Sequence, residues 1–135
     1  MDEAIKKKSY WGWGTALLIV VVIAFAISQL PRGFSEDLSA IGQGSPVVVV
    51  VHNKEDMRSQ YLMTMVDEVR GDYSDRVEFR IADTSVRLGT AFSVAHRVSG
   101  ATLVLFDAGG QRIVALNDVD DNAMLITELD KAFNF

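Results

Sequence analysis

Hydrophobic residues follow two different patterns in this chain of 135 residues. Residues 11–30 contain no charged side chain, and an apolar helix of about 20 residues is long enough to cross the hydrocarbon core of a bilayer. From residue 46 onward, short apolar runs alternate with amphipathic stretches. The sequence therefore predicts a transmembrane helix over 11–30, a linker over 31–45 and a folded domain over 46–135.

The residues before the apolar segment predict its orientation. Segments rich in Lys and Arg stay on the cytoplasmic side of a membrane, and Trp favours the headgroup level. The residues that we expect at this membrane interface are Lys6, Lys7, Lys8, Trp11 and Trp13. We therefore expect 1–10 to be a cytoplasmic tail of a single-pass inner (cytoplasmic) membrane protein, with the domain in the periplasm or otherwise outside the cell. A basic start followed by an apolar core is also the layout of a cleaved signal peptide, which is the alternative.

The linker contains a short segment with helix signals. Ser35 is placed to cap a short helix, because two acidic residues follow it in the first turn. Leu38 and Ile41 are spaced to pack on the domain that follows.

The domain reads as alternating strands and helices. The β-branched run 47–51 predicts a strand that is covered on both faces. Asn53 is the expected N-cap of a helix that buries Tyr61 and Met65 and leaves Met57 exposed. The other predicted elements are a strand over 77–81, a helix capped by Ser85 and packed through Leu88, Phe92 and Ala95, strands over 101–106 and 112–116 joined by a glycine hairpin, and a helix over 122–133. This order predicts an α/β domain with a mixed four-stranded sheet flanked by helices.

Two segments of the domain resemble thioredoxins. Residues 49–69 align without a gap to the thioredoxin strand, active-site turn and following helix, and residues 101–106 match a Pro-Thr-aliphatic-aliphatic-aliphatic-Phe strand of that family. The resemblance covers residues 46–135 and implies a thioredoxin-like fold.

The departures from the family pattern bear on function. The Cys-x-x-Cys motif falls on Asp56, Met57, Arg58 and Ser59, and the chain has no cysteine. The cis-proline is replaced by Ala101, for which we expect a trans peptide bond, because a non-proline cis bond costs about 2.5–4 kcal/mol. Since the thiolate is the nucleophile of the family's chemistry, the resemblance implies a redox-inactive member that is not an enzyme.

Composition and charge exclude other functions. Without cysteine there is no disulfide framework and no thiolate ligand for a metal. A sequence pI near 4.9 argues against nucleic acid as a partner. The acidic run 118–121 lacks the glycine and glutamate of a calcium loop, so we interpret it as a solvated turn before the last helix. We therefore expect no metal and no cofactor, and give His52 and His96 no catalytic role.

The leading hypothesis is an interaction module. The chain would be an accessory or assembly subunit of a membrane protein complex, held in the bilayer by residues 11–30. From residue 33 onward, 9 basic residues stand against 16 acidic ones, a net charge of −7 that favours a basic partner. The alternative is a periplasmic chaperone or holdase with transient clients. The expected partner-binding residues are Asp56, Met57, Arg58, Ser59, Gly100, Ala101 and Thr102.

Overall fold

The computed structural model describes residues 2–28 and 34–135, which form two separate units. The first unit contains the helix α1 (Asp2–Ser28). Within it, Trp11–Ser28 has a mean hydropathy of 2.1 and is long and apolar enough to cross a membrane. The predicted last residues of the span and the start of the linker, 29–33, lie outside the described residues.

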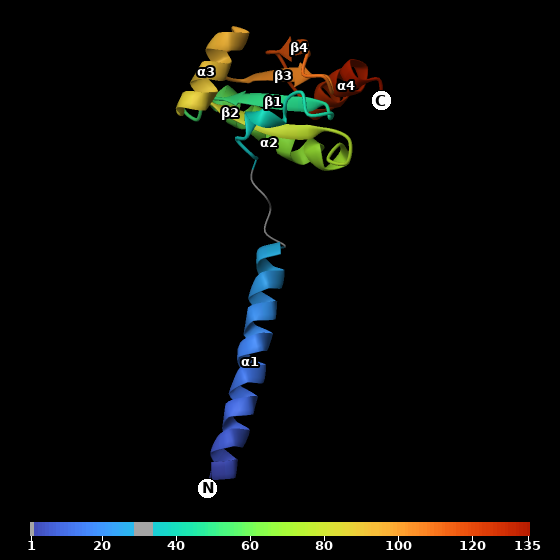
Figure 1. Ribbon diagram of the computed structural model, residues 1–135. Helices are drawn as coiled ribbons and strands as arrows, with labels where there is room; N and C mark the ends of the chain where they lie inside the picture. Colours follow the sequence, from blue (N-terminus) through green and yellow to red (C-terminus); the bar gives the residue numbers. More distant parts are fainter. Residues whose placement is uncertain (1, 29–33) are drawn as a thin grey trace. The chain divides into compact units, whose positions relative to one another are not determined.

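The second unit is built on a mixed four-stranded sheet in the order β2-β1-β3-β4 (Figure 1). Its strands are β1 (Val47–His52), β2 (Glu78–Asp83), β3 (Thr102–Phe106) and β4 (Arg112–Leu116). β1 pairs parallel with β2 and antiparallel with β3, and β3 pairs antiparallel with β4. The predicted fold class is confirmed.

Helices cover both faces of this sheet. They are α2 (Met57–Val69), α3 (Arg87–His96) and α4 (Asn122–Phe133), with two short 3₁₀ helices, η1 (Leu38–Ala40) and η2 (Arg70–Asp72). Because alternate side chains of a strand point to opposite faces, Val48 and Val50 join the core under α2 and α4. The other valines of β1 join a second core under α3 and η1.

The start of α2 differs from the prediction. Its N-cap is Asp56, whose carboxylate accepts the backbone N–H of Arg58 at 2.9 Å. Asn53 instead begins a turn, in which its carbonyl oxygen accepts the N–H of Asp56 at 3.0 Å and its side chain accepts that of Glu55 at 3.1 Å. The predicted cap at Asn53 is therefore wrong, because this turn delays the helix by three residues.

The segment before β1 also differs in its cap. Asp37, and not Ser35, caps η1 by accepting the N–H of Ser39. The carbonyl of Ser35 instead accepts the N–H of Ile81 at 3.0 Å, beside the edge strand β2. Leu38 and Ile41 pack against the second core, as the sequence predicts.

The packing of α3 is only partly as expected. Phe92 is buried, but Leu88 and Ala95 are exposed. Ser85 forms no cap, since its hydroxyl donates to Asp83. The cause is Gly89, where a Cβ atom would lie only 1.9 Å from the carbonyl oxygen of Asp83. The glycine face of α3 thus lies directly on the backbone at the end of β2, and this rotation turns Leu88 outward.

Substitution of Gly89 tests this close approach. Because the obstructing atoms belong to backbone, Gly89→Ala should lower the free energy of unfolding by about 1–3 kcal/mol. The matched control is Gly71→Ala in η2, where a Cβ would meet nothing within 4 Å, and which should be neutral or stabilise by up to about 1 kcal/mol. Urea unfolding of the full chain in mild detergent, followed by circular dichroism, measures both. Equal midpoints would contradict the packing described.

His96 gives the domain a pH dependence. Its ring lies 4.4 Å from that of Phe92 and 5.3 Å from that of Phe106. Burial, assisted by the nearby Arg112 guanidinium, lowers the pKa of His96 below 6.5. The unfolded chain therefore takes up this proton more readily than the folded one, so stability is lost as the pH falls through and below that value.

A phenylalanine at position 96 should remove this contribution. Between about pH 7.5 and about pH 5.5, urea unfolding of the full chain should show a smaller loss of stability in His96→Phe than in the wild type, because carboxylate titration is common to both proteins. An identical loss in the two proteins would rule out the assigned role.

Candidate functional site

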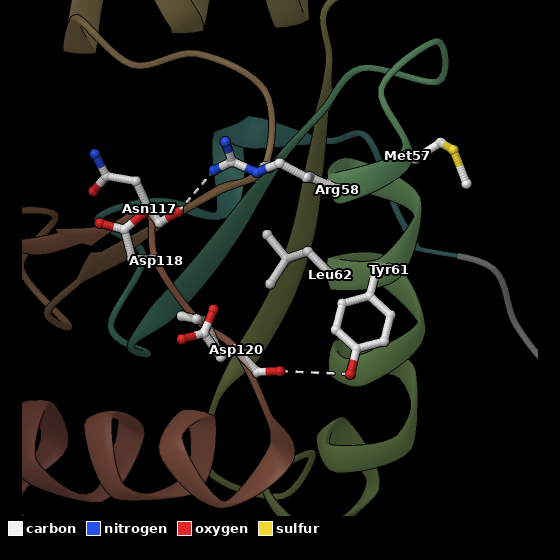
Figure 2. A pocket seen from close by; sticks show the side chains of 9 residues that line it. Met57, Arg58, Tyr61, Leu62, Asn117, Asp118 and Asp120 are labelled. Carbon is white, nitrogen blue, oxygen red and sulfur yellow. Dashed lines mark hydrogen bonds between the residues drawn. The ribbon is translucent and has the colours of Figure 1, made fainter.

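A hollow of about 420 Å³ opens beside the start of α2. One wall is the first turns of α2, and the other is the segment 117–120 that joins β4 to α4 (Figure 2). The residues that line it are Met57, Arg58, Tyr61, Leu62, Ala101, Asn117, Asp118, Val119 and Asp120.

Two side chains of α2 reach across to the opposite wall. Arg58 Nη2 donates to the backbone carbonyl of Asn117 at 3.3 Å, and the hydroxyl of Tyr61 makes a long contact of 3.5 Å with the carbonyl of Asp120. Figure 2 shows both interactions as dashed lines. They link the 117–120 segment to α2 at two points along the hollow.

Met57 and Tyr61 are the exposed apolar residues of this wall. They lie one helical turn apart on the same side of α2 and are 82% and 57% exposed, respectively. The predicted burial of Tyr61 is wrong, whereas the burial of Met65 and the exposure of Met57 are confirmed. The buried face of α2 is formed by Ser59, Leu62, Met65, Val66 and Val69, and Tyr61 lies outside this stripe.

Ser59 supports the hollow from beneath. It is fully buried, and its Oγ accepts the backbone N–H of Asn53 at 3.0 Å and that of Ala101 at 2.7 Å. One hydroxyl thus joins the first turn of α2 to the end of β1 and to the start of β3. Ser59 therefore has a structural position in the site and no exposed surface of its own.

The chain before β3 is closely packed against this hydroxyl. Ala101 has a left-handed backbone with φ of 60° and is almost fully buried. A Cβ at Gly100 would lie 2.8 Å from the Cβ of Asn53, so only glycine fits there without movement. Thr102 is buried in β3. Among residues 2–28 and 34–135 no peptide bond is cis, in agreement with the trans bond expected at Ala101.

The structure therefore separates the seven expected partner-binding residues into two groups. Met57, Arg58 and Ala101 line the hollow. The other four, Asp56, Ser59, Gly100 and Thr102, do not line it; they cap the helix or form the packed base.

The second wall is not predicted by the sequence, which indicates only a solvated turn in the acidic run after β4. Asp121 does cap α4, by accepting the N–H of Met124 at 2.7 Å. The atoms that contact Arg58 and Tyr61, however, are backbone carbonyls of Asn117 and Asp120. Every residue type carries such a carbonyl, so no sequence signal could have identified them.

The site has no thiol chemistry of its own. The chain contains no thiol, so it cannot perform thiol–disulfide exchange with a cysteine of its own. Within the part of the chain that the structure describes, no group of three or more His, Asp or Glu residues is arranged to hold a metal ion.

The hydroxyl of Ser59 can be tested by its removal. Ser59→Ala leaves the N–H of Asn53 without its acceptor, which should cost about 1–3 kcal/mol of stability. The N–H of Ala101 keeps a second acceptor, the carbonyl of Val51 at 3.0 Å. Thr64→Ala is the control, because that exposed hydroxyl of α2 contacts only its own helix and its loss should change stability by less than about 0.5 kcal/mol. Comparable urea midpoints for the two variants would refute the bridging role.

Comparison with solved structures places the fold among the thioredoxins. A thioredoxin from Thermus thermophilus aligns with a TM-score of 0.63 and 20% identity, over 73% of this chain and 84% of its own. Thioredoxin O2 from Arabidopsis thaliana aligns with a TM-score of 0.57 and 19% identity, over 69% of this chain and 83% of its own. A malarial protein aligns with a TM-score of 0.56 and 15% identity, over 65% and 97%. No protein-family model and no curated protein sequence matches the chain. At these identities the similarity establishes a thioredoxin-like fold.

Proposed function

We propose that this chain is a non-catalytic, membrane-anchored interaction module, which serves as an accessory or assembly subunit of a membrane protein complex. One observation carries the proposal. At the segment where thioredoxins carry their cysteines, this chain has no thiol and instead exposes Met57 and Tyr61 on one wall of a hollow.

The chemistry of the hollow suits a protein partner. Methionine is flexible and polarisable, and adapts to different apolar surfaces, while tyrosine combines a large apolar ring with a hydroxyl group. Both types are enriched in protein interfaces, as is arginine. The base beneath them is held by the two hydrogen bonds of Ser59 and by the packing of Gly100. A preorganised base lowers the entropy that binding costs.

The anchor and the charge support the same proposal. α1 supplies a candidate membrane span, and the lysines that precede it favour an amino terminus in the cytoplasm. The domain is then extracytoplasmic. Its net charge of −7 from residue 33 onward suits a partner with a basic surface.

Copurification from native membranes in mild detergent tests this proposal. The full chain should be recovered with one membrane partner at fixed stoichiometry. Met57→Ser should reduce recovery of that partner at least about fivefold, which corresponds to an interface contact worth more than about 1 kcal/mol. Ile126→Ser is the control, because Ile126 is an exposed residue of α4 outside the hollow. A chain that emerges alone, or equal losses in the two variants, would refute the proposal.

The alternative, a holdase with transient clients, gives a different result in the same experiment. It would yield many clients at low and variable stoichiometry, and none would persist through purification. The exposed Met57 alone would suit either function, because surfaces that serve many clients are Met-rich or loop-rich and able to repack. The packed base formed by Ser59 and Gly100 favours a fixed partner, because it limits such repacking.

A further inference from the structure

A second exposed surface lies on α3, which covers the face of the sheet opposite α2 and α4 (Figure 1). Leu88 and Val94 are 70% and 73% exposed there, and Val86 just before the helix is also exposed. The side chains of Arg87 and Arg97 lie beside them along the chain and are exposed as well. We call these five residues, Val86, Arg87, Leu88, Val94 and Arg97, the α3 patch.

The α3 patch is basic in an acidic domain. Residues 84–106, which include α3, contain Arg87 and Arg97 but no Asp or Glu. The ion pairs found in residues 34–135 involve Arg70, Arg76 and Arg80. Neither Arg87 nor Arg97 has a side-chain hydrogen bond or ion pair within the described residues. Two unneutralised guanidinium groups thus flank exposed aliphatic side chains.

A third guanidinium lies at the carboxyl end of α3. Arg112 Nη1, from the edge strand β4, donates to the backbone carbonyl of His96 at 2.7 Å. Because His96 directly precedes Arg97, the Arg112 guanidinium adds positive charge at this end of α3.

We propose that the α3 patch docks on the surface of a bilayer that contains anionic phospholipids. Aliphatic side chains bordered by Arg or Lys are the composition of helices that lie in the membrane interface, where the apolar groups enter the acyl boundary and the cations meet phosphate. Because the rest of the domain is strongly acidic, an anionic surface repels its other faces and favours this one.

Because the domain is joined to the membrane anchor by a short segment, even a weak contact of the α3 patch can hold it on the lipid surface. Residues 29–33 separate α1 from Phe34, and five residues span at most about 18 Å when fully extended. A domain anchored through α1 is therefore held close to the lipid surface, so docking is an intramolecular event with a high effective concentration. The inference rests on the membrane anchoring in the proposed function but not on the hollow beside α2.

Single-cysteine labelling tests the docking directly, since the chain has no cysteine of its own. The full chain carrying Ala91→Cys on the exposed side of α3, or Thr127→Cys on the exposed side of α4 as control, is labelled with an environment-sensitive fluorophore. Each protein is reconstituted into vesicles of phosphatidylcholine alone or of a two-to-one mixture with phosphatidylglycerol. Lipids with brominated acyl chains report contact by quenching.

We expect quenching at position 91 in the mixed vesicles, much less in phosphatidylcholine alone, and none at position 127 in either. Adding Arg87→Glu and Arg97→Glu together should lower the ratio of docked to undocked domain by more than about tenfold. The inference is overturned if position 91 stays in water in both bilayers, as it would if an acidic protein covers the patch. The inference is also overturned if quenching at position 91 is equal in the two kinds of vesicle, or if the two Arg→Glu substitutions leave it unchanged.

A separate readout distinguishes failure of the anchor from failure of the inference. If α1 spans the bilayer, the reconstituted chain floats with the vesicles after extraction with alkaline carbonate, whatever the state of the α3 patch. Loss of flotation refutes the anchoring and the docking together. Retained flotation without quenching at position 91 refutes the docking alone.

Discussion

The complete burial of the five valines of β1 is the constraint on which the domain depends. These valines, 47–51, have no exposed surface, although adjacent ones point to opposite faces of the sheet. Full burial of a side chain of this kind contributes about 1.5–3 kcal/mol, and it is possible only if both faces are covered. α2 and α4 cover one face, and α3 with the segment around η1 covers the other. The residues that precede β1 are therefore part of the packed domain.

The geometry of the site is set by the turn that joins the end of β1 to the start of α2. The chain turns at Asn53, starts α2 at Met57, and the hydroxyl of Ser59 returns to bind Asn53 and Ala101. In a thioredoxin-like fold this junction is where thiol chemistry would reside, according to the resemblance in sequence. In this chain the junction carries an exposed methionine and an exposed tyrosine, and the chain has no cysteine.

The sequence predicted the fold class well because hydrophobic periodicity is decided by burial. The valine run, the order of strands and helices along the chain and the final helix are all confirmed. The cap assignments at Asn53, Ser35 and Ser85 are wrong. The side chains of Asn53 and Ser85 bind within local turns, and the backbone of Ser35 pairs with the edge strand β2. The exposure of Leu88 followed from the contact of Gly89 with β2, which no pattern on α3 itself records. The second wall of the hollow could not be predicted from the sequence either, because its contacts with α2 are made by backbone carbonyls, which every residue type carries.

The proposed function depends on the binding of a fixed partner by the surface around Met57. Its most direct test is a photo-crosslinking amino acid placed at position 57 of the full chain in native membranes, with position 127 on α4 as the reference. We expect one crosslinked product of defined mass from position 57 and none from position 127. No product from position 57, or the same distribution of products from both positions, would contradict it.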